Sequence, residues 1–279
     1  MKTTARVKSF VKQNKILLVI ILLALLLRFV GLMPNTINAD ESYVQTHSWD
    51  LVLNLIKHGD PNPHTFKYGS LMFYFQAIAA FPILITTYFL EILNTSLSSS
   101  FTAKALDFGL FYDEAIRKYS QELVSVGRAE TAFFGVITVV VLYLLAKKLF
   151  NKNIGLLSAF FLAITPLHVR DSHYITTDIL SILAVLIALL SLVYMMDTKS
   201  WKWFILSGIT LGISATIRYY PIAFLAYPFA LLFSFTKNRE WFYKVFVSVS
   251  FVIFGIFIGM PYLFLDPNGP TLMMQDLQK

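Results

Sequence analysis

Residues 16–43 read ILLVIILLALLLRFVGLMPNTINADESY, an apolar run followed by two adjacent acids. The run Ile16–Met33 is close to the ~20 residues that a helix needs to cross a bilayer. The residues before it are basic with no acid, which places the N-terminus in the cytoplasm: Lys2, Arg6, Lys8, Lys12 and Lys15. A cleaved signal sequence is the alternative, but Arg28 and the lack of a clean small-x-small site favour a retained helix. In both cases Asp40 and Glu41 lie outside.

The composition indicates an all-α, polytopic membrane protein. Hydrophobic residues make up 57% of the chain and charged residues 14%, whereas soluble domains carry roughly 25% charged residues. The net charge of +7 does not indicate nucleic acid binding, because the basic residues cluster in short links between apolar runs. With no cysteine, the chain has no disulfide, no Cys-ligated zinc site and no iron–sulfur site.

Three basic or mixed links divide the second half of the chain. If all three are cytoplasmic, six further crossings alternate correctly and give about seven transmembrane helices in total. The links contain Lys147, Lys148 and Lys152, then Lys199 and Lys202, then Lys237, Arg239 and Lys244. The crossings are expected at about 128–146, 154–168, 177–196, 203–219, 221–235 and 245–263.

Another apolar stretch, about 69–90, is also long enough to span. If it crossed, every later loop would invert and the lysine-rich links would face outward. We therefore predict an outer-leaflet juxtamembrane helix, bent at Pro82, within one long external loop over 34–126. Residues 1–279 then form a single transmembrane module in the plasma membrane.

Four polar clusters are expected on the external face: Asp40–Glu41, 128–130, 170–178 and 218–220. Adjacent residues on a helix do not share a face, so one acid can face a cavity while its neighbour is held by its surroundings. A carboxylate near lipid loses hydration, which makes it a better general base at neutral pH. Asp40 and Glu41 are therefore the catalytic candidates, although Asp40 would also serve as a plain helix cap.

Cations on the same side predict an anionic partner. Arg128 opens one helix and Arg218 lies near the end of another, and guanidinium binds phosphate bidentately. Lys67 and Tyr68 precede the juxtamembrane helix and would contribute to the same pocket. The alternative is that both arginines extend from helix ends toward the interface.

The turn RDSHYITTD, residues 170–178, is dense in polar groups. Thr176 or Thr177 would cap the next helix, and Asp178 in its first turn would suit the helix dipole. That structural role does not account for His173, which we place near the site with Asp178. A divalent metal is left open, but His47, His58 and His64 show no H-E-x-x-H or other tight ligand spacing.

Taken together, these residues resemble the multi-spanning GT-C glycosyltransferases, most closely the protein O-mannosyltransferase and aminoarabinose-transferase group. The first helix with its arginine, followed by Asp-Glu, is similar to the start of that group. Further similar stretches are FKYGSLMFY at 66–74 without the usual prolines, GRAETAFFG at 127–135, PLHVRDSHYITTD at 166–178, and ATIRYYP at 215–221 with arginine where lysine is common.

The resemblance implies a catalytic Asp at position 40, a juxtamembrane segment after Tyr68, and a polyprenyl-phosphate-linked sugar as donor. The acceptor would be a lipid, a glycan or a protein. Family members usually continue with more helices, so a C-terminal continuation is expected that these 279 residues do not contain. Two alternatives are a transporter or lipid flippase, which would place charges near the bilayer midplane, and a non-catalytic membrane subunit.

Overall fold

The computed structural model describes residues 14–32, 38–97, 112, 114, 116, 118–218 and 222–278. Helices make up most of this part of the chain, and none of its residues forms a strand, which confirms the all-α class. The basic residues before position 14, the middle of the predicted external loop, and Tyr219 and Tyr220 of the fourth polar cluster lie outside the described residues.

The helices follow one another with short connections. They are α2 (Lys15–Phe29), α3 (Ala39–His58), α4 (Ser70–Leu97), α6 (Ser120–Leu149), α7 (Lys152–Ile164), α8 (Pro166–Asp171), α9 (Thr177–Thr198), α10 (Trp201–Arg218), α11 (Ile222–Ser234), α12 (Arg239–Gly259), α13 (Tyr262–Leu265) and α14 (Gly269–Asp276).

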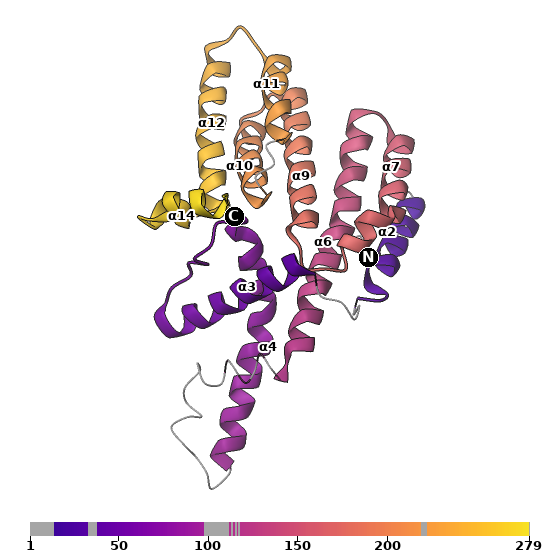
Figure 1. The fold of residues 1–279 in the computed structure, drawn as a ribbon. Coiled ribbons are helices and arrows are strands. Elements are labelled where there is room, and N and C mark those ends of the chain that lie inside the picture. Colours follow the sequence, from indigo (N-terminus) through magenta and orange to yellow (C-terminus); the bar gives the residue numbers. More distant parts are fainter. Residues whose placement is uncertain are drawn as a thin grey trace, which may run out of the picture.

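The long helices form two upright groups (Figure 1). One group contains α9 to α12 and the other contains α2, α6 and α7, with α6 packed against α9. Helix α3 lies across the lower end of the group α9 to α12, and α4 and the first part of α6 extend beyond it in the opposite direction. Helix α4 packs against α3 and α6 and also contacts α10 and α12.

Within the described residues, four helices are long and apolar enough to cross a membrane: Ser70–Leu90 of α4, then α6, α9 and α12. Helix α7 and the segment Ala223–Ser234 are apolar but shorter. Length and composition thus support a multi-pass membrane protein, while the count of seven crossings stays a prediction. Helix α4 continues through Pro82 as far as Leu97, past the expected end at about residue 90.

The predicted crossing at 154–168 is wrong at its end, because α7 stops at Ile164 and a separate short helix, α8, starts at Pro166. Proline lacks the N–H that would continue the helix and forces the preceding residue into an extended conformation, here Thr165 with ψ 116°. Arg28 bonds two of the carbonyl groups at this break. Its guanidinium, fully buried, donates to the carbonyl oxygens of Leu162 at 3.1 Å and Ala163 at 3.0 Å.

Helices α10 and α12 approach each other so closely that glycine is required at the contact. A Cβ at Gly212 would lie 2.2 Å from the carbonyl oxygen of Val252, and one at Gly255 would lie 2.3 Å from that of Ile209. Small residues at a helix interface allow such approach within a membrane. This contact fixes the position of α10, whose last residue is Arg218.

Replacing Gly212 by valine should therefore destabilise the protein by about 1–3 kcal/mol, because the two backbones must separate to admit the side chain. The measurement is thermal unfolding of the purified chain in detergent. The control is Val249→Ile, which adds bulk to an exposed position of α12 and should leave the unfolding temperature nearly unchanged. Equal effects of the two substitutions would contradict the close contact.

Candidate functional site

A buried ion pair holds the start of α3. Glu41 is fully buried, and its carboxylate receives Arg128 Nε and Nη2, each at 2.7 Å. The backbone N–H of Ile175 donates to the same carboxylate at 3.2 Å, and that of Asn38 at 3.4 Å within a capping box. Glu41 therefore connects α3, α6 and the turn before α9, which is a positioning role.

Arg128 is 1% exposed and uses its third nitrogen as well, because Nη1 donates to the carbonyl oxygen of Leu32 at 3.2 Å. Its guanidinium carbon also lies 5.4 Å from the centre of the Tyr174 ring. Every guanidinium nitrogen thus has a partner within the protein. Its predicted contact with a phosphate stays a prediction, and the geometry favours the other cations for that contact.

Asp40 points the other way, as expected for the neighbour of a buried residue on a helix. Its side chain is 36% exposed, and its Oδ1 accepts a hydrogen bond from the Tyr68 hydroxyl at 2.9 Å and lies 3.9 Å from Lys67 Nζ. Burial, together with the Asp40 carboxylate, raises the pKa of Tyr68 to about 12. Tyr68 therefore stays protonated and donates to Asp40 across the physiological range.

Two cations flank Tyr68. Lys67 Nζ lies 5.3 Å from the centre of the Tyr68 ring and 4.6 Å from that of Tyr43. The guanidinium carbon of Arg218 lies 6.0 Å from the Tyr68 ring, and Arg218 forms an ion pair with Asp178 in the first turn of α9. The structure thus gathers five of the predicted residues, Asp40, Lys67, Tyr68, Asp178 and Arg218.

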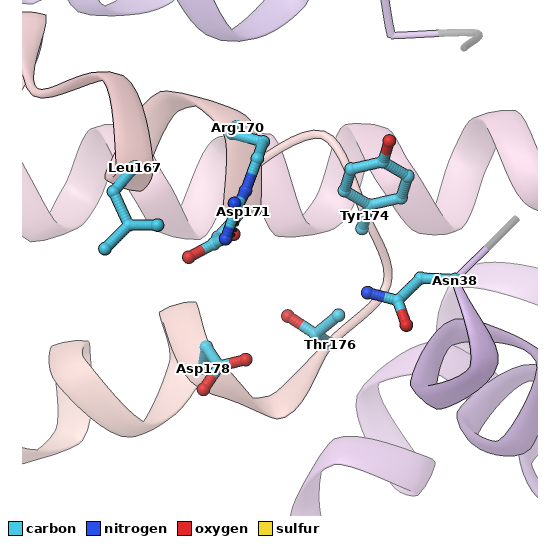
Figure 2. A pocket seen from close by; sticks show the side chains of 7 residues that line it. All are labelled: Asn38, Leu167, Arg170, Asp171, Tyr174, Thr176 and Asp178. Atoms are coloured by element: carbon cyan, nitrogen blue, oxygen red, sulfur yellow. Dashed lines mark hydrogen bonds and ion pairs between the residues drawn. The ribbon is translucent and has the colours of Figure 1, made fainter. Parts of the chain in front are cut away.

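A pocket of about 560 Å³ opens beside this group, as Figure 2 shows. Its walls come from the start of α3, from α8, from the turn after it and from the start of α9. The lining residues are Asn38, Leu167, Arg170, Asp171, Tyr174, Thr176 and Asp178.

Two features of this pocket are chemically informative. Both of its carboxylates have an arginine partner, because Asp171 pairs with Arg170 at 2.8 Å and Asp178 pairs with Arg218. Thr176 is 4% exposed, and its hydroxyl has no hydrogen-bond partner among the described residues, although it occupies the N-cap position of α9. A charge-compensated pocket with an unused hydroxyl suits a polar ligand with little net charge.

His173 does not share the pocket. Its Nε2 lies 3.1 Å from the carbonyl oxygen of Leu27 in the last turn of α2. Sequence reasoning missed Asn38 and Thr176 as lining residues, although both lie in the stretches that indicated the site. A helix N-cap was expected at Thr176 or Thr177, and the sequence carried no sign that the Thr176 hydroxyl would lack a capping bond.

Two of the three histidines expected in the external loop have local partners. His64 Nε2 pairs with Asp60 at 2.8 Å, and His47 Nδ1 lies 2.9 Å from the carbonyl oxygen of Tyr43. In the part of the chain that the structure describes, no three His, Cys, Asp or Glu side chains gather closely enough to hold a metal ion.

Removing Glu41 should cost far more stability than removing Asp40. Glu41→Ala leaves the buried Arg128 charge without a partner, which costs about 3–5 kcal/mol. Asp40→Ala removes a partly exposed carboxylate and should cost about 1 kcal/mol or less. Thermal unfolding of both variants in detergent measures the difference, and the double variant Glu41→Gln, Arg128→Met should recover part of the loss. Equal shifts for the two single variants would contradict the positioning role of Glu41.

Comparison with known proteins supplies a family. The model of the dolichyl-phosphate-mannose-protein mannosyltransferase family matches residues 123–264, just over half of the chain, while no curated protein and no solved structure matches significantly. The matched range includes Arg128, the 170–178 turn and Arg218, whereas Asp40 and Lys67 lie before it. Apolar helices that suit a membrane agree with this match, which confirms the resemblance seen in the sequence. The chain belongs to the dolichyl-phosphate-mannose-protein mannosyltransferase family, a family of membrane glycosyltransferases.

Proposed function

We propose that this protein transfers a sugar from a polyprenyl-phosphate donor to an acceptor hydroxyl at the external membrane surface, with Asp40 as the general base. The observation that carries the proposal is the arrangement around Asp40. Its Oδ1 is held by Tyr68 and faces Lys67, while no described residue bonds Oδ2. One oxygen is thus fixed in place and the other can receive a proton.

The chemical step follows from this arrangement. Asp40 takes the proton of the acceptor hydroxyl as its oxygen attacks the anomeric carbon from the side opposite the phosphate. The bond from the anomeric carbon to the phosphate oxygen breaks, its electron pair leaves with the polyprenyl phosphate, and the configuration inverts. A phosphate leaves as a stable anion, so a general acid is not required, and cations that stabilise its growing charge lower the barrier.

Lys67 and Arg218 are the cations best placed for the leaving phosphate. Both lie at the Tyr68 ring, and their side chains are 45% and 23% exposed, so each can be reached from outside. Arg218 already pairs with Asp178, and a guanidinium with five donors can serve a carboxylate and a phosphate together. Arg128 acts indirectly, because it bonds the Glu41 carboxylate and so holds the start of α3, which carries Asp40.

The pocket of Figure 2 suits the sugar itself. Its volume lies within the ~300–1,000 Å³ that small-molecule sites occupy, and its paired carboxylates can still accept hydrogen bonds from hydroxyl groups without adding net charge. Asn38 connects it to the base, because the Asn38 side chain accepts the Asp40 N–H at 3.2 Å.

An apolar cavity of about 190 Å³ near Arg218 can take the phosphate-proximal end of the lipid of such a donor. It lies between α4, α6, α9 and α10, and its lining includes Ile217, adjacent to Arg218, and Leu71, three residues after Tyr68. A polyprenyl chain whose first units lie there would hold its phosphate at the cations. Phe75, Phe134, Leu183 and Ile213 also line this cavity.

The position of the basic helix ends supports an external site in a plasma-membrane protein with a cytoplasmic N-terminus. Lys148 at the end of α6 pairs with Asp197 at the end of α9, and Lys244 in α12 donates to the carbonyl oxygen of Lys199 at 2.8 Å. These contacts bring the basic links together at the helix ends opposite the Asp40 site. The positive-inside rule then makes that end cytoplasmic. Seven crossings with α4 outside the lipid core complete this arrangement.

Asp40→Asn should lower transfer by about 10²–10⁴-fold, the usual contribution of a general base. The assay follows a labelled sugar from polyprenyl-phosphate mannose to acceptor in membranes that contain the protein. The matched control is Asp197→Asn, an acid at the opposite end of the helices that should retain wild-type activity. Retention of most activity by the Asp40 variant would exclude Asp40 as the base.

Thr176→Val should lower kcat/KM for the donor by about fivefold, because a hydrogen bond to the sugar is worth about 1 kcal/mol. The substitution keeps the shape of the side chain and removes a hydroxyl that makes no capping bond, so stability should change little. Thr138→Val is the control, since that buried hydroxyl already bonds the carbonyl oxygen of Phe134 in its own helix. Identical kinetics of both variants and the wild type would place the sugar elsewhere.

A further inference from the structure

Lys67 and Tyr68 belong to the connection between α3 and α4, residues 59–69, and a connection of this kind keeps a fixed shape only where it is bonded. Its end is fixed at α10. The N–H of Gly69 donates to the carbonyl oxygen of Ile217 at 3.2 Å, and a Cβ at Gly69 would lie 2.2 Å from the carbonyl oxygen of Thr216. The end of this loop is thus held beside Arg218.

The middle of the loop is bonded by the C-terminal helix α14. Asp276 Oδ2 accepts the backbone N–H of Phe66 at 2.9 Å and lies 3.5 Å from the Thr65 hydroxyl. The Phe66 side chain is fully buried, and a backbone N–H at such a position needs a partner. A carboxylate makes that hydrogen bond stronger than a neutral acceptor would.

Hydrogen bonds continue from this point to the base. The Thr65 oxygen accepts the N–H of Lys67 at 3.4 Å and bonds the hydroxyl of Tyr43, whose ring faces Lys67 Nζ. The next residue, Tyr68, donates to Asp40 at 2.9 Å. A short series of contacts therefore leads from Asp276 to both residues that touch Asp40.

A second carboxylate from the segment after α12 contacts the same loop. Asp266 accepts a hydrogen bond from Asn62 Nδ2 at 3.1 Å. Asn62 is 4% exposed, and its Oδ1 accepts the N–H of His64 at 3.0 Å. Both ends of the segment 266–276 are thus bonded to the loop that carries Lys67.

Helix stability does not explain the acid at position 276. Asp276 is the last residue of α14, where the helix dipole disfavours a negative charge. An acid at that end is unfavourable for α14 alone, whereas its carboxylate accepts hydrogen bonds from residues 65 and 66 of the loop.

We propose that Asp276 is a positioning residue that holds the loop of Lys67 and Tyr68 in place, so that α14 sets the geometry around Asp40. The proposal rests on the proposed function for its kinetic effect, while its structural effect can be measured without any activity. Residues 266–276 lie beyond the range that matches the family model.

The test compares Asp276→Leu, which removes the acceptor, with Asp276→Asn, which keeps an oxygen for the Phe66 N–H. Hydrogen exchange of peptides covering residues 62–69 should accelerate in the leucine variant and stay close to wild type in the asparagine variant. In the transfer assay the leucine variant should lose about 10–100-fold in kcat, since small misplacement of reacting groups costs that much, with a smaller change in KM.

The matched control is Asp197→Leu, an acid near the end of another helix that pairs with Lys148 far from the loop. It should leave both exchange and kcat unchanged. Unchanged exchange at 62–69 in Asp276→Leu, or equal effects of the leucine and asparagine variants, would overturn the proposal. If Asp40→Asn kept its activity, the proposed function would fail, and the exchange experiment would still decide the role of Asp276.

Discussion

The buried pair of Glu41 and Arg128 is the contact on which the site depends. The Glu41 carboxylate receives two guanidinium nitrogens and two backbone N–H groups, so the desolvation of both charges is offset by a full set of hydrogen bonds. Those donors come from α6, from the turn before α9 and from the start of α3. These bonds therefore hold together three segments far apart in sequence, and two of them, the start of α3 and the turn before α9, line the pocket.

Much of the fold follows from apolar runs and their ends. The start of α9 at Thr177 agrees with the sequence, because a threonine at the N-cap position and an acid in the first turn mark a helix start locally. The predicted end of the crossing at 154–168 is wrong even though Pro166 is visible in the sequence, because the polar residues beyond it suggested one longer crossing. Hydropathy measures how apolar a stretch is, not whether its backbone hydrogen bonds continue.

The site was predictable in outline and less so in its roles. A polar turn between apolar helices, an acid pair and two arginines indicated which segments converge, since polar groups at helix ends gather on one membrane side. The sequence did not reveal which charged residues pair with each other. Glu41 and Arg128 are 87 residues apart, and their contact depends on how the helices pack. His173 shows the same limit, since the direction of a side chain in a turn is set by its neighbours, here the end of α2.

The two adjacent acids, Asp40 and Glu41, differ in their surroundings because neighbouring positions on a helix face different directions. Because Glu41 is directed into the protein by four donors, its neighbour Asp40 must face outward, where its side chain is 36% exposed. Both carboxylate oxygens of Glu41 already accept hydrogen bonds from within the protein, whereas Asp40 keeps an oxygen that no described residue bonds. A nonpolar replacement for the buried pair would remove the directional bonds that orient α3. The ion pair is therefore better understood as the element that orients Asp40 than as a source of stability.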